Sequence, residues 1–386
     1  MHKSDKPSIL APAGPAWAGS LMGTSIAASL TAAHGLPGWL PALFAIIAAG
    51  ILVTVTVGWV IYRNPHFSHI FMPAWGMYAM GILACGSAWT AVTSNDWFQL
   101  ISWWVGTPLG IVVCLNQLRG FAGSPTFQWG LALVAPMVGA TSGGQLAPAH
   151  GELYHTVGAG CFMLSLVTAL PIFARVYIDV CRGKLHLPGQ IAGTAWIPLG
   201  VIGQSTAAAQ VLFGGKLAII YGAVMLIAGI RMVEYAMKQF YVAVFEWDGY
   251  SPGWWGSTFP TGTLCLGTHL LSKTASALWL DYVSIFFLIL LLGHWTICCL
   301  RFVSWLIYES PAAHRYHAKR HPTLIVEDPR FHHGGDQSGK TVAAERIASG
   351  EATSEDLTGS ARPLVDMQCV EKSSIAAGGT SVGIQK

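Results

Sequence analysis

Residues 15–23 read PAWAGSLMG and residues 73–81 read PAWGMYAMG, so a proline, an alanine, a tryptophan and a methionine–glycine pair recur in the same places. Three further prolines continue the repeat at similar distances along the chain. The five are Pro15, Pro73, Pro136, Pro198 and Pro260, spaced by 58, 63, 62 and 62 residues. A period of about 60 residues is too long for a soluble solenoid repeat, but it fits two membrane-spanning helices with their loops. We therefore expect an all-α membrane protein built of five helical hairpins around a central pore.

The composition also indicates a membrane protein. Hydrophobic residues make up 53% of the 386 residues and charged residues only 10%, whereas soluble domains carry about 25% charged residues. The N-terminus leads through a Pro/Ala/Gly-rich stretch into the first apolar run, without the short apolar core and cleavage site of a signal peptide. The eight cysteines show no metal-binding spacing, and we expect them as small apolar residues within helices.

Ten runs are long enough to cross a bilayer, which takes about 20 residues. They cover residues 15–34, 39–61, 71–93, 97–118, 127–147, 153–178, 189–212, 217–239, 253–272 and 279–306. We therefore predict a transmembrane domain over 15–308 with both termini on one side of the membrane. A short segment, 1–14, precedes it, and a charged, Ser/Thr/Gly-rich tail, 309–386, follows it and is expected to be largely disordered.

Lysine and arginine are distributed unevenly between the two sets of connections. Twelve fall on the side of the termini: Lys3, Lys6, Arg63, Arg119, Arg175, Arg182, Lys184, Lys238, Arg301, Arg315, Lys319 and Arg320. Only Lys216 and Lys273 fall on the opposite side. Because positive residues collect in cytoplasmic loops, we predict cytoplasmic termini and odd-numbered spans that run outward. The expected location is the lipid bilayer of the cell membrane.

Odd- and even-numbered spans differ in small and polar residues. The odd spans hold seventeen glycines and the even spans nine, although the even spans are longer in total. Small residues let helices approach closely, and polar groups at membrane depth need protein or water around them. We therefore predict that odd spans form an inner ring around the pore and even spans an outer, lipid-facing ring. The predicted pore-lining residues are Thr24, Ser25, Gly81, Thr141, Ser142, Gln145, Gln204, Ser205, Thr258, Thr261 and Thr263. The alternative is a set of helix-packing glycines without any pore.

The recurring proline fits the inner ring, because it removes an intrahelical hydrogen bond and the freed backbone is tolerated beside a watery cavity. The predicted helix kinks are Pro73, Pro136, Pro198 and Pro260. For Pro15 and Pro73, close to the ends of their spans, a helix-start role is the alternative. Residues 254–263 read WWGSTFPTGT, and Phe259 before the proline is either a core-packing residue or a ring that projects into a narrow lumen.

Motifs of enzymes are missing from the chain, which has no Walker loop, no H-E-x-x-H, no G-x-S-x-G and no close carboxylate pair within the spans. We expect no catalysis, no cofactor, no metal ion and no nucleic-acid partner.

The distribution of charge favours an anion as the partner. Fixed charges are nearly absent from the inner spans, whereas cation pathways place Asp or Glu along the route. The predicted outer vestibule is basic and consists of His34, His155, His269, Lys216 and Lys273. Its histidines are either interfacial residues with one hydrogen bond each or groups that charge in mildly acidic medium and concentrate anions.

Five short motifs, in register with the ten spans, resemble the tellurite-resistance/dicarboxylate transporter family, which includes fungal malate permeases, sulfite exporters and plant slow anion channels. The motifs lie at 15–25, 80–81, 135–137, 198–205 and 254–260, within a resemblance over about residues 12–306. The resemblance implies ten helices in five hairpins with quasi-five-fold symmetry, a homotrimer, and one pore per subunit. The gating phenylalanine of the family, just before the proline of the ninth helix, would fall on Phe259.

The expected function is the movement of small anions through a pore lined by odd spans and gated by Phe259. C4-dicarboxylates such as malate or succinate are the first expectation. Inorganic anions (sulfite, tellurite, chloride or nitrate) are the alternative, because the resemblance does not choose among substrates. A remoter alternative is a membrane sensor or scaffold that signals through its tail.

Overall fold

The computed structural model describes residues 10–123 and 125–312, and within them every regular element is helical. Each of the ten expected spans coincides with one α-helix. These are α1 (Ala18–Ala33), α2 (Trp39–Tyr62), α3 (Met72–Thr93), α4 (Trp97–Gln117), α5 (Gly130–His150), α6 (Glu152–Cys181), α7 (Ile197–Leu212), α8 (Gly215–Glu246), α9 (Thr258–Ala275) and α10 (Leu278–Ser304). The predicted all-α class is confirmed. The predicted tail lies outside the described residues from position 313 onward, as do positions 1–9.

Every odd-numbered helix begins with a short 3₁₀ segment, and in the described part of the chain no even-numbered α-helix does. The segments are η1 (Pro15–Trp17), η2 (His69–Phe71), η3 (Phe127–Trp129), η4 (Gly189–Trp196) and η5 (Pro252–Ser257). A 3₁₀ helix is wound more tightly than an α-helix. The sequence repeat therefore has a structural counterpart, a change of winding where each odd helix begins. Among the described helices, α10 alone continues into a π-helical turn, η6 (Trp305–Glu309).

Most of the repeated prolines lie at these junctions. Pro15 opens η1, Pro73 and Pro198 are the second residues of α3 and α7, and Pro260 is the third residue of α9. The N–H groups of a first helical turn lack an intrahelical partner, so proline removes no α-helical hydrogen bond there. Pro73, Pro198 and Pro260 therefore lie where the 3₁₀ winding gives way to the α-helix, and their role as kinks stays a prediction. Pro136 lies inside α5, and its kink stays a prediction.

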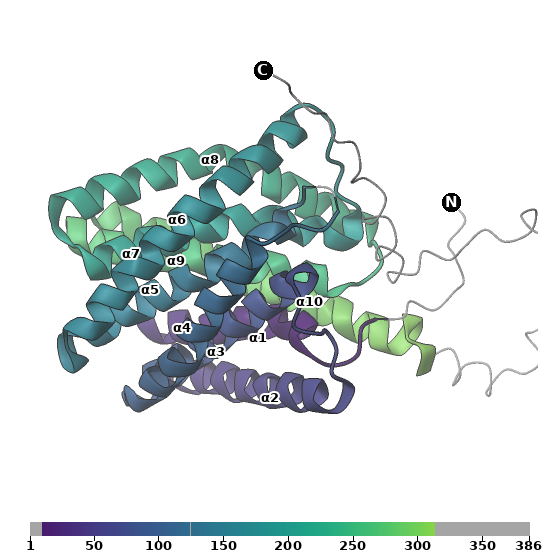
Figure 1. The fold of residues 1–386 in the computed structure, drawn as a ribbon, viewed down its shortest axis with the longest axis horizontal. Coiled ribbons are helices and arrows are strands. Elements are labelled where there is room, and N and C mark those ends of the chain that lie inside the picture. Colours follow the sequence, from purple (N-terminus) through teal and green to yellow (C-terminus); the bar gives the residue numbers. More distant parts are fainter. Residues whose placement is uncertain (1–9, 124, 313–386) are drawn as a thin grey trace, which may run out of the picture. The chain divides into compact units, whose positions relative to one another are not determined.

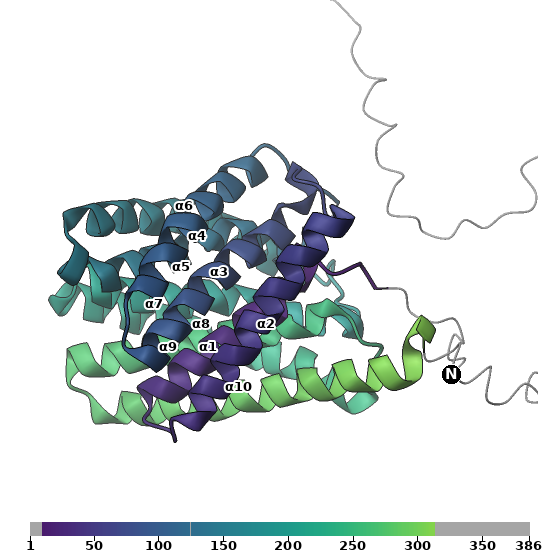
Figure 2. The ribbon, with the colours of Figure 1, turned by 90° about the horizontal axis from the view of Figure 1, so that it is seen from below.

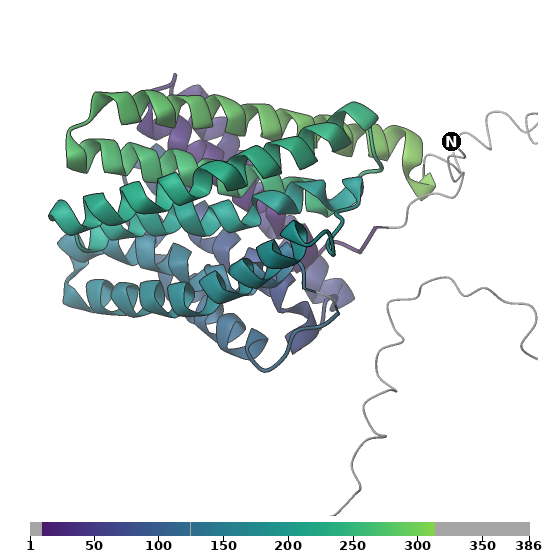
Figure 3. The same cartoon turned by 90° about the horizontal axis from the view of Figure 1, so that it is seen from above.

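Consecutive helices pack as antiparallel pairs, namely α1 with α2, α3 with α4, α5 with α6, α7 with α8 and α9 with α10. The connections within the pairs are short, at 34–38, 94–96, 151, 213–214 and 276–277, as is usual between antiparallel neighbours. The pairs follow one another in chain order around the bundle, and the last pair contacts the first (Figures 1 and 3). We call the end with these short connections the far end, and the end where the odd helices begin the near end.

The odd-numbered helices form a closed ring. Each contacts the next, from α1 through α3, α5 and α7 to α9, and α9 contacts α1. Glycines permit this closeness: a Cβ on Gly203 of α7 would lie 2.3 Å from the carbonyl carbon of Thr263 on α9. A Cβ on Gly267 of α9 would in turn lie 2.5 Å from the carbonyl oxygen of Gly203. Part of the glycine enrichment on odd helices therefore serves helix packing.

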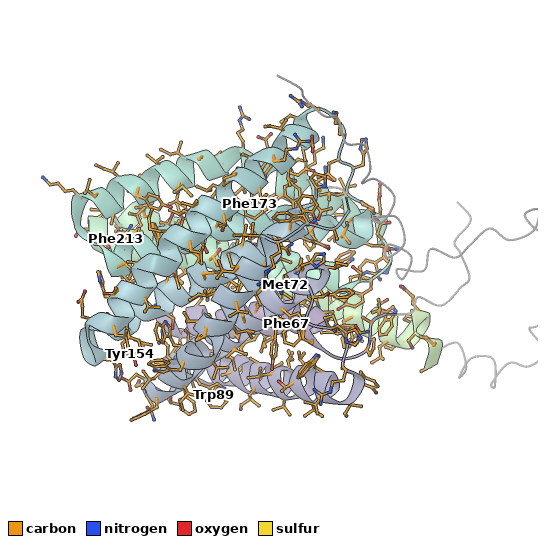
Figure 4. The ribbon with its side chains drawn as sticks, viewed as in Figure 1. Phe67, Met72, Trp89, Tyr154, Phe173 and Phe213 are labelled. Atoms are coloured by element: carbon orange, nitrogen blue, oxygen red, sulfur yellow. The ribbon has the colours of Figure 1, made fainter. Side chains whose placement is uncertain are left out.

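The even-numbered helices present the outer apolar surface. Within the described α-helices, the exposed large apolar side chains belong to even-numbered ones, for example Val167 on α6 and Leu217 on α8, which are 66% and 82% exposed. Among the described residues, six helices are long and apolar enough to cross a membrane, the five even-numbered ones and α3 with its 3₁₀ segment. Figure 4 shows the side chains over the bundle, with Tyr154 and Phe213 toward the far end. Exposed apolar surface of this extent suits lipid rather than water.

Candidate functional site

A cavity of about 340 Å³ lies inside the ring in its far half. The residues that line this cavity come from all five odd-numbered helices, with one further residue from α4, so the cavity lies on the axis of the ring. Its polar residues are Ser29, Ser87, Thr90, Gln99, Thr141, Ser142, Gln145, Gln204 and His269. The structure thus brings together four of the predicted pore residues, Thr141, Ser142, Gln145 and Gln204, around one cavity.

A much smaller cavity of about 30 Å³ lies on the same axis in the near half. It is lined by residues from η5 and from the first halves of the five odd helices. The larger apolar side chains in its wall are Met22, Met77, Met80, Leu131, Val134, Ile197, Trp255 and Phe259. Met22 and Met80 are the methionines of the matching stretches 15–23 and 73–81, so the sequence repeat brings equivalent residues to one constriction.

Phe259 lies at the boundary of the two cavities, because it lines both. It belongs to the first turn of α9, next to Pro260, and is 5% exposed. An aromatic ring therefore lies between the two cavities. The placement agrees with the position that the family resemblance implies, and the gating role stays a prediction.

Amide side chains connect α4, α5 and α7 around the wide cavity. Gln99 Nε2 donates to Ser142 Oγ at 3.0 Å and to Gln145 Oε1 at 2.7 Å. Gln204 Nε2 donates to Thr141 Oγ1 at 2.8 Å. Because Gln145 accepts with its oxygen, its –NH₂ group is the part that can donate to a ligand, and Ser142 likewise accepts and keeps its own proton.

The walls of both axial cavities lack fixed charge. Among the described residues that line them there is no Lys, Arg, Asp or Glu, and His269 is the one titratable side chain. An anion in the wide cavity would therefore be held by neutral dipoles, which bind weakly enough to release it again.

His294 of α10 supports the helix start that carries Phe259. Its Nδ1 lies 3.3 Å from the carbonyl oxygen of Ser257 and 3.2 Å from Thr261 Oγ1. A carbonyl oxygen only accepts, so Nδ1 carries the proton. The ring is fully buried, 4.8 Å from the ring of Trp196 and 4.8 Å from that of Phe240 between centroids. An even-numbered helix thus contacts the backbone of Ser257 before Phe259 and the side chain of Thr261 after it.

Seven predicted pore-lining residues do not line the axial cavities: Thr24, Ser25, Gly81, Ser205, Thr258, Thr261 and Thr263. All seven are buried. The hydroxyls of Thr258, Thr261 and Thr263 donate to backbone carbonyls of the preceding turn, and a hydroxyl satisfied in this way needs no water. Helix packing alone accounts for these positions, and their pore-lining role stays a prediction.

A larger cavity of about 580 Å³ lies off the axis, among α1, α2 and α10. This crevice reaches the near end at Ala13 and Trp17, and Figure 2 shows α2 and α10 diverging toward that end. Thr24 lies in its wall and accepts a hydrogen bond from Trp295 Nε1 at 3.0 Å. The Thr24 hydroxyl therefore joins α1 to α10 on the side away from the axis.

The five predicted vestibule residues all lie toward the far end: His34, His155, His269, Lys216 and Lys273. The structure brings His34 and His269 together, with 4.7 Å between ring centroids, and His269 lines the wide cavity. His155 is held on α6, where its Nε2 lies 3.0 Å from the backbone oxygen of Leu212. Both lysines are exposed.

Sequence reasoning missed several residues that the structure places on the axis, among them Gln99, Met22 and Met80. Gln99 belongs to α4, an even-numbered helix, yet it reaches the wide cavity. The feature of the sequence that could have identified Gln99 is its amide, which stands in a run otherwise rich in aromatic and aliphatic residues. Met22 and Met80 mark the repeat in the sequence, and their equal offsets from Pro15 and Pro73 are the signal that they share one level of the ring.

Comparison with known proteins finds fungal relatives. The sulfite efflux pump SSU1 of Arthroderma otae is 25% identical over 250 residues, and that of Trichophyton rubrum is 22% identical over 247 residues. The matched segments cover 55% and 56% of this chain and 64% of each relative. The chain therefore spans less than two thirds of the length of these relatives.

The family described as voltage-dependent anion channel (SLAC1) matches residues 13–303. The matched range begins before η1 and ends within α10, so it contains both axial cavities and Phe259. It also contains all five motifs on which the family resemblance depends, and that resemblance is confirmed. This chain, with its ring of odd-numbered helices around an uncharged axial pathway, belongs to the voltage-dependent anion channel (SLAC1) family.

Proposed function

We propose that this protein moves small anions across a membrane along the axis of its ring of odd-numbered helices. The observation that carries the proposal is the position of Phe259, which lines both the wide polar cavity and the narrow apolar one. In the wide cavity, the Gln145 –NH₂ group and the Ser142 hydroxyl offer protons that replace part of the hydration of an anion. The Phe259 ring closes the passage at rest and turns aside to open it.

Among small anions we favour an inorganic ion such as sulfite over a C4-dicarboxylate. Two relatives bear the name sulfite efflux pump. The chemistry of the cavity points the same way, because proteins commonly hold carboxylates through paired arginine donors, and the wide cavity has none in its wall. A compact ion also passes more easily through a constriction of about 30 Å³ than an extended molecule with a carboxylate at each end. Malate or succinate is the second candidate.

The proposal includes an arrangement in the membrane. All ten helices cross the bilayer as five hairpins related by a quasi-five-fold axis along the pathway, which the closed ring and the 3₁₀ start of each odd helix support. The even-numbered helices shield the more polar odd ones from lipid. Both termini are cytoplasmic in the cell membrane, because the near-end connections carry the excess of Lys and Arg. The family resemblance adds a homotrimer with one pathway per subunit.

Flux measurements on the full chain in liposomes test the substrate. Sulfite, chloride, malate and succinate are supplied at equal concentrations, and protein-free liposomes give the background. We expect sulfite and chloride to move faster than the dicarboxylates. The reverse order would return malate or succinate to first place, and no flux above background would overturn anion transport.

The gate is tested by Phe259→Ala, which removes the ring between the two cavities. We expect the anion flux to rise about tenfold or more, the equivalent of at least 1.4 kcal/mol on the barrier. Phe162 of α6 is a matched control, since it is also 5% exposed but lines neither axial cavity. Either substitution removes a buried ring at a similar cost of about 3 to 5 kcal/mol. Unchanged or lower flux through folded Phe259→Ala protein would contradict the gating role.

A further inference from the structure

Two histidines and a carboxylate meet at the far end, beside the wide cavity. His34 directly follows α1, His269 belongs to the second half of α9, and Asp281 lies in the first turn of α10. Each residue offers one ligand atom, and these atoms all lie within 4.8 Å of one another. Within residues 10–123 and 125–312, this is the one group of three or more His, Cys, Asp or Glu side chains that could hold a metal ion.

The ring of His34 is oriented as in metal sites. Its Nδ1 lies 2.9 Å from the carbonyl oxygen of Leu30 and must donate, because a carbonyl only accepts. Nε2 therefore presents a lone pair, and it faces α10 at 2.9 Å from Ser284 Oγ. Ser284 can donate its proton to the backbone oxygen of Cys265, at 3.0 Å, so a metal on Nε2 leaves that hydroxyl satisfied. Metal-bound histidines commonly donate their other ring N–H to a backbone carbonyl in this way.

His269 and Asp281 already lie at ligand spacing. Ligand atoms about 2.0 to 2.1 Å from a tetrahedral zinc lie about 3.3 Å apart, and His269 Nδ1 is 3.1 Å from Asp281 Oδ1. A carboxylate oxygen only accepts, so Nδ1 carries the proton in this contact, and zinc binding at Nδ1 requires that proton to move to Nε2 of the same ring. The widest separation in the group, 4.8 Å, must shrink by roughly 1.5 Å to reach that spacing. The two side chains are 14% and 27% exposed, and His269 lines the wide cavity, so an ion has a path of entry.

We propose that His34, His269 and Asp281 bind a zinc ion at the far mouth of the axial pathway, with water in the fourth position. Two imidazoles and one carboxylate form a three-residue ligand set typical of open zinc sites. The ion joins α1, α9 and α10, and α9 is the helix whose first turn carries Phe259. Zinc therefore stabilises α9 at the end opposite to Phe259, the proposed gate. The binding itself does not depend on the proposed anion transport.

Zinc titration of the purified full chain in detergent tests the site. The sequence after residue 312 holds further histidines, which are replaced by glutamine in every protein used so that they bind no zinc: His314, His317, His321, His332 and His333. We expect calorimetry to give one zinc ion per chain. The melting temperature should rise with the zinc concentration, because zinc binds the folded state, and EDTA should reverse the rise.

Substitution of single ligands locates the ion. His34→Gln, His269→Gln and Asp281→Asn should each weaken zinc binding by about tenfold or more and remove the rise in melting temperature. His150→Gln is the matched control, because His150 Nε2 lies 2.7 Å from Asp96 Oδ2 at the same end, and the described residues offer this pair no third ligand. It should bind zinc as the parent does, and melting in EDTA shows that each variant is folded.

Three results would overturn the proposal. One is the absence of saturable zinc binding to the parent protein. Another is parent-like affinity in both His34→Gln and His269→Gln. The last is loss of binding in His150→Gln, which would place the ion at a different histidine.

Discussion

The two halves of the axial pathway are built from the same five helices and yet differ in width and polarity. The far half is a cavity of about 340 Å³ with hydroxyl and amide side chains in its wall, and the near half measures about 30 Å³ and is lined mainly by methionine and aliphatic residues. Polar side chains in the wall of a cavity offer hydrogen-bond partners to an anion, whereas a narrow apolar stretch excludes water and therefore also excludes the hydrated ion. The difference suggests that the far half binds the anion. The near half, together with Phe259, then controls its passage.

Gln145→Glu should have the largest effect, since it places a negative charge in the half that is proposed to hold anions. Gln145 is exposed to the wide cavity, and its oxygen accepts from Gln99. Two like charges 4 Å apart repel by about 1 kcal/mol in water and about 4 kcal/mol near a protein surface. We expect anion flux in liposomes at neutral pH to fall about tenfold or more.

Two further substitutions of Gln145 separate charge from shape. Gln145→Leu removes the donor without adding charge and should lower the flux less than Gln145→Glu does. Gln145→Lys adds a positive charge and should not lower the rate of anion entry. Equal losses in all three variants would show that only the shape of the side chain matters there, and the contrast between a polar and an apolar half would lose its functional meaning.

Met80→Ser should have an intermediate effect, in the opposite direction. Met80 lines the small cavity together with Met22. A shorter side chain with a hydroxyl widens the constriction and gives water a partner, so we expect the flux to rise about three- to fivefold. Met163→Ser on the outer side of α6, where the residue is 55% exposed, is the control and should leave the flux unchanged. Lower flux through folded Met80→Ser protein would contradict a restricting role of the apolar half.

Gly200→Ala should have the smallest effect on flux. A Cβ at this position would lie 3.7 Å from Pro260 Cγ, an ordinary contact, so the ring accepts it. Gly200 lines the small cavity, and the added methyl group narrows it, so we expect about a twofold loss of flux with an unchanged melting temperature.

Gly203→Ala on the same helix provides the contrast in stability. A Cβ there would lie 2.3 Å from the backbone of Thr263, so α7 and α9 must separate. We expect a lower melting temperature and a lower yield of folded protein. If Gly200→Ala destabilised the chain as much as Gly203→Ala, the distinction between a lining glycine and a packing glycine would fail.

The helices could be predicted from the sequence, while the direction in which each residue faces could not. Gln145 and Gln204 line the wide cavity as expected, yet Thr258 and Thr263, chosen on the same grounds, donate to backbone carbonyls of the preceding turn. An inner helix is buried on all sides, so a polar residue on it can face the axis or a neighbouring helix with no difference in local sequence. Gln99 shows the converse, because a long amide near the start of an even-numbered helix reaches the axis.

The sequence by itself determined the helical elements, their pairing into hairpins, and the division into small, polar odd helices and apolar even ones. Hydropathy, glycine content and the recurring proline act along each helix separately, so each segment carries its own signal. Only the tertiary structure decided that Phe259 borders both cavities and that His34, His269 and Asp281, far apart in the chain, come together. Those positions depend on how each helix is rotated and set in depth against its neighbours. Contacts such as that of Gly203 with Thr263 fix this rotation, and no single segment contains them.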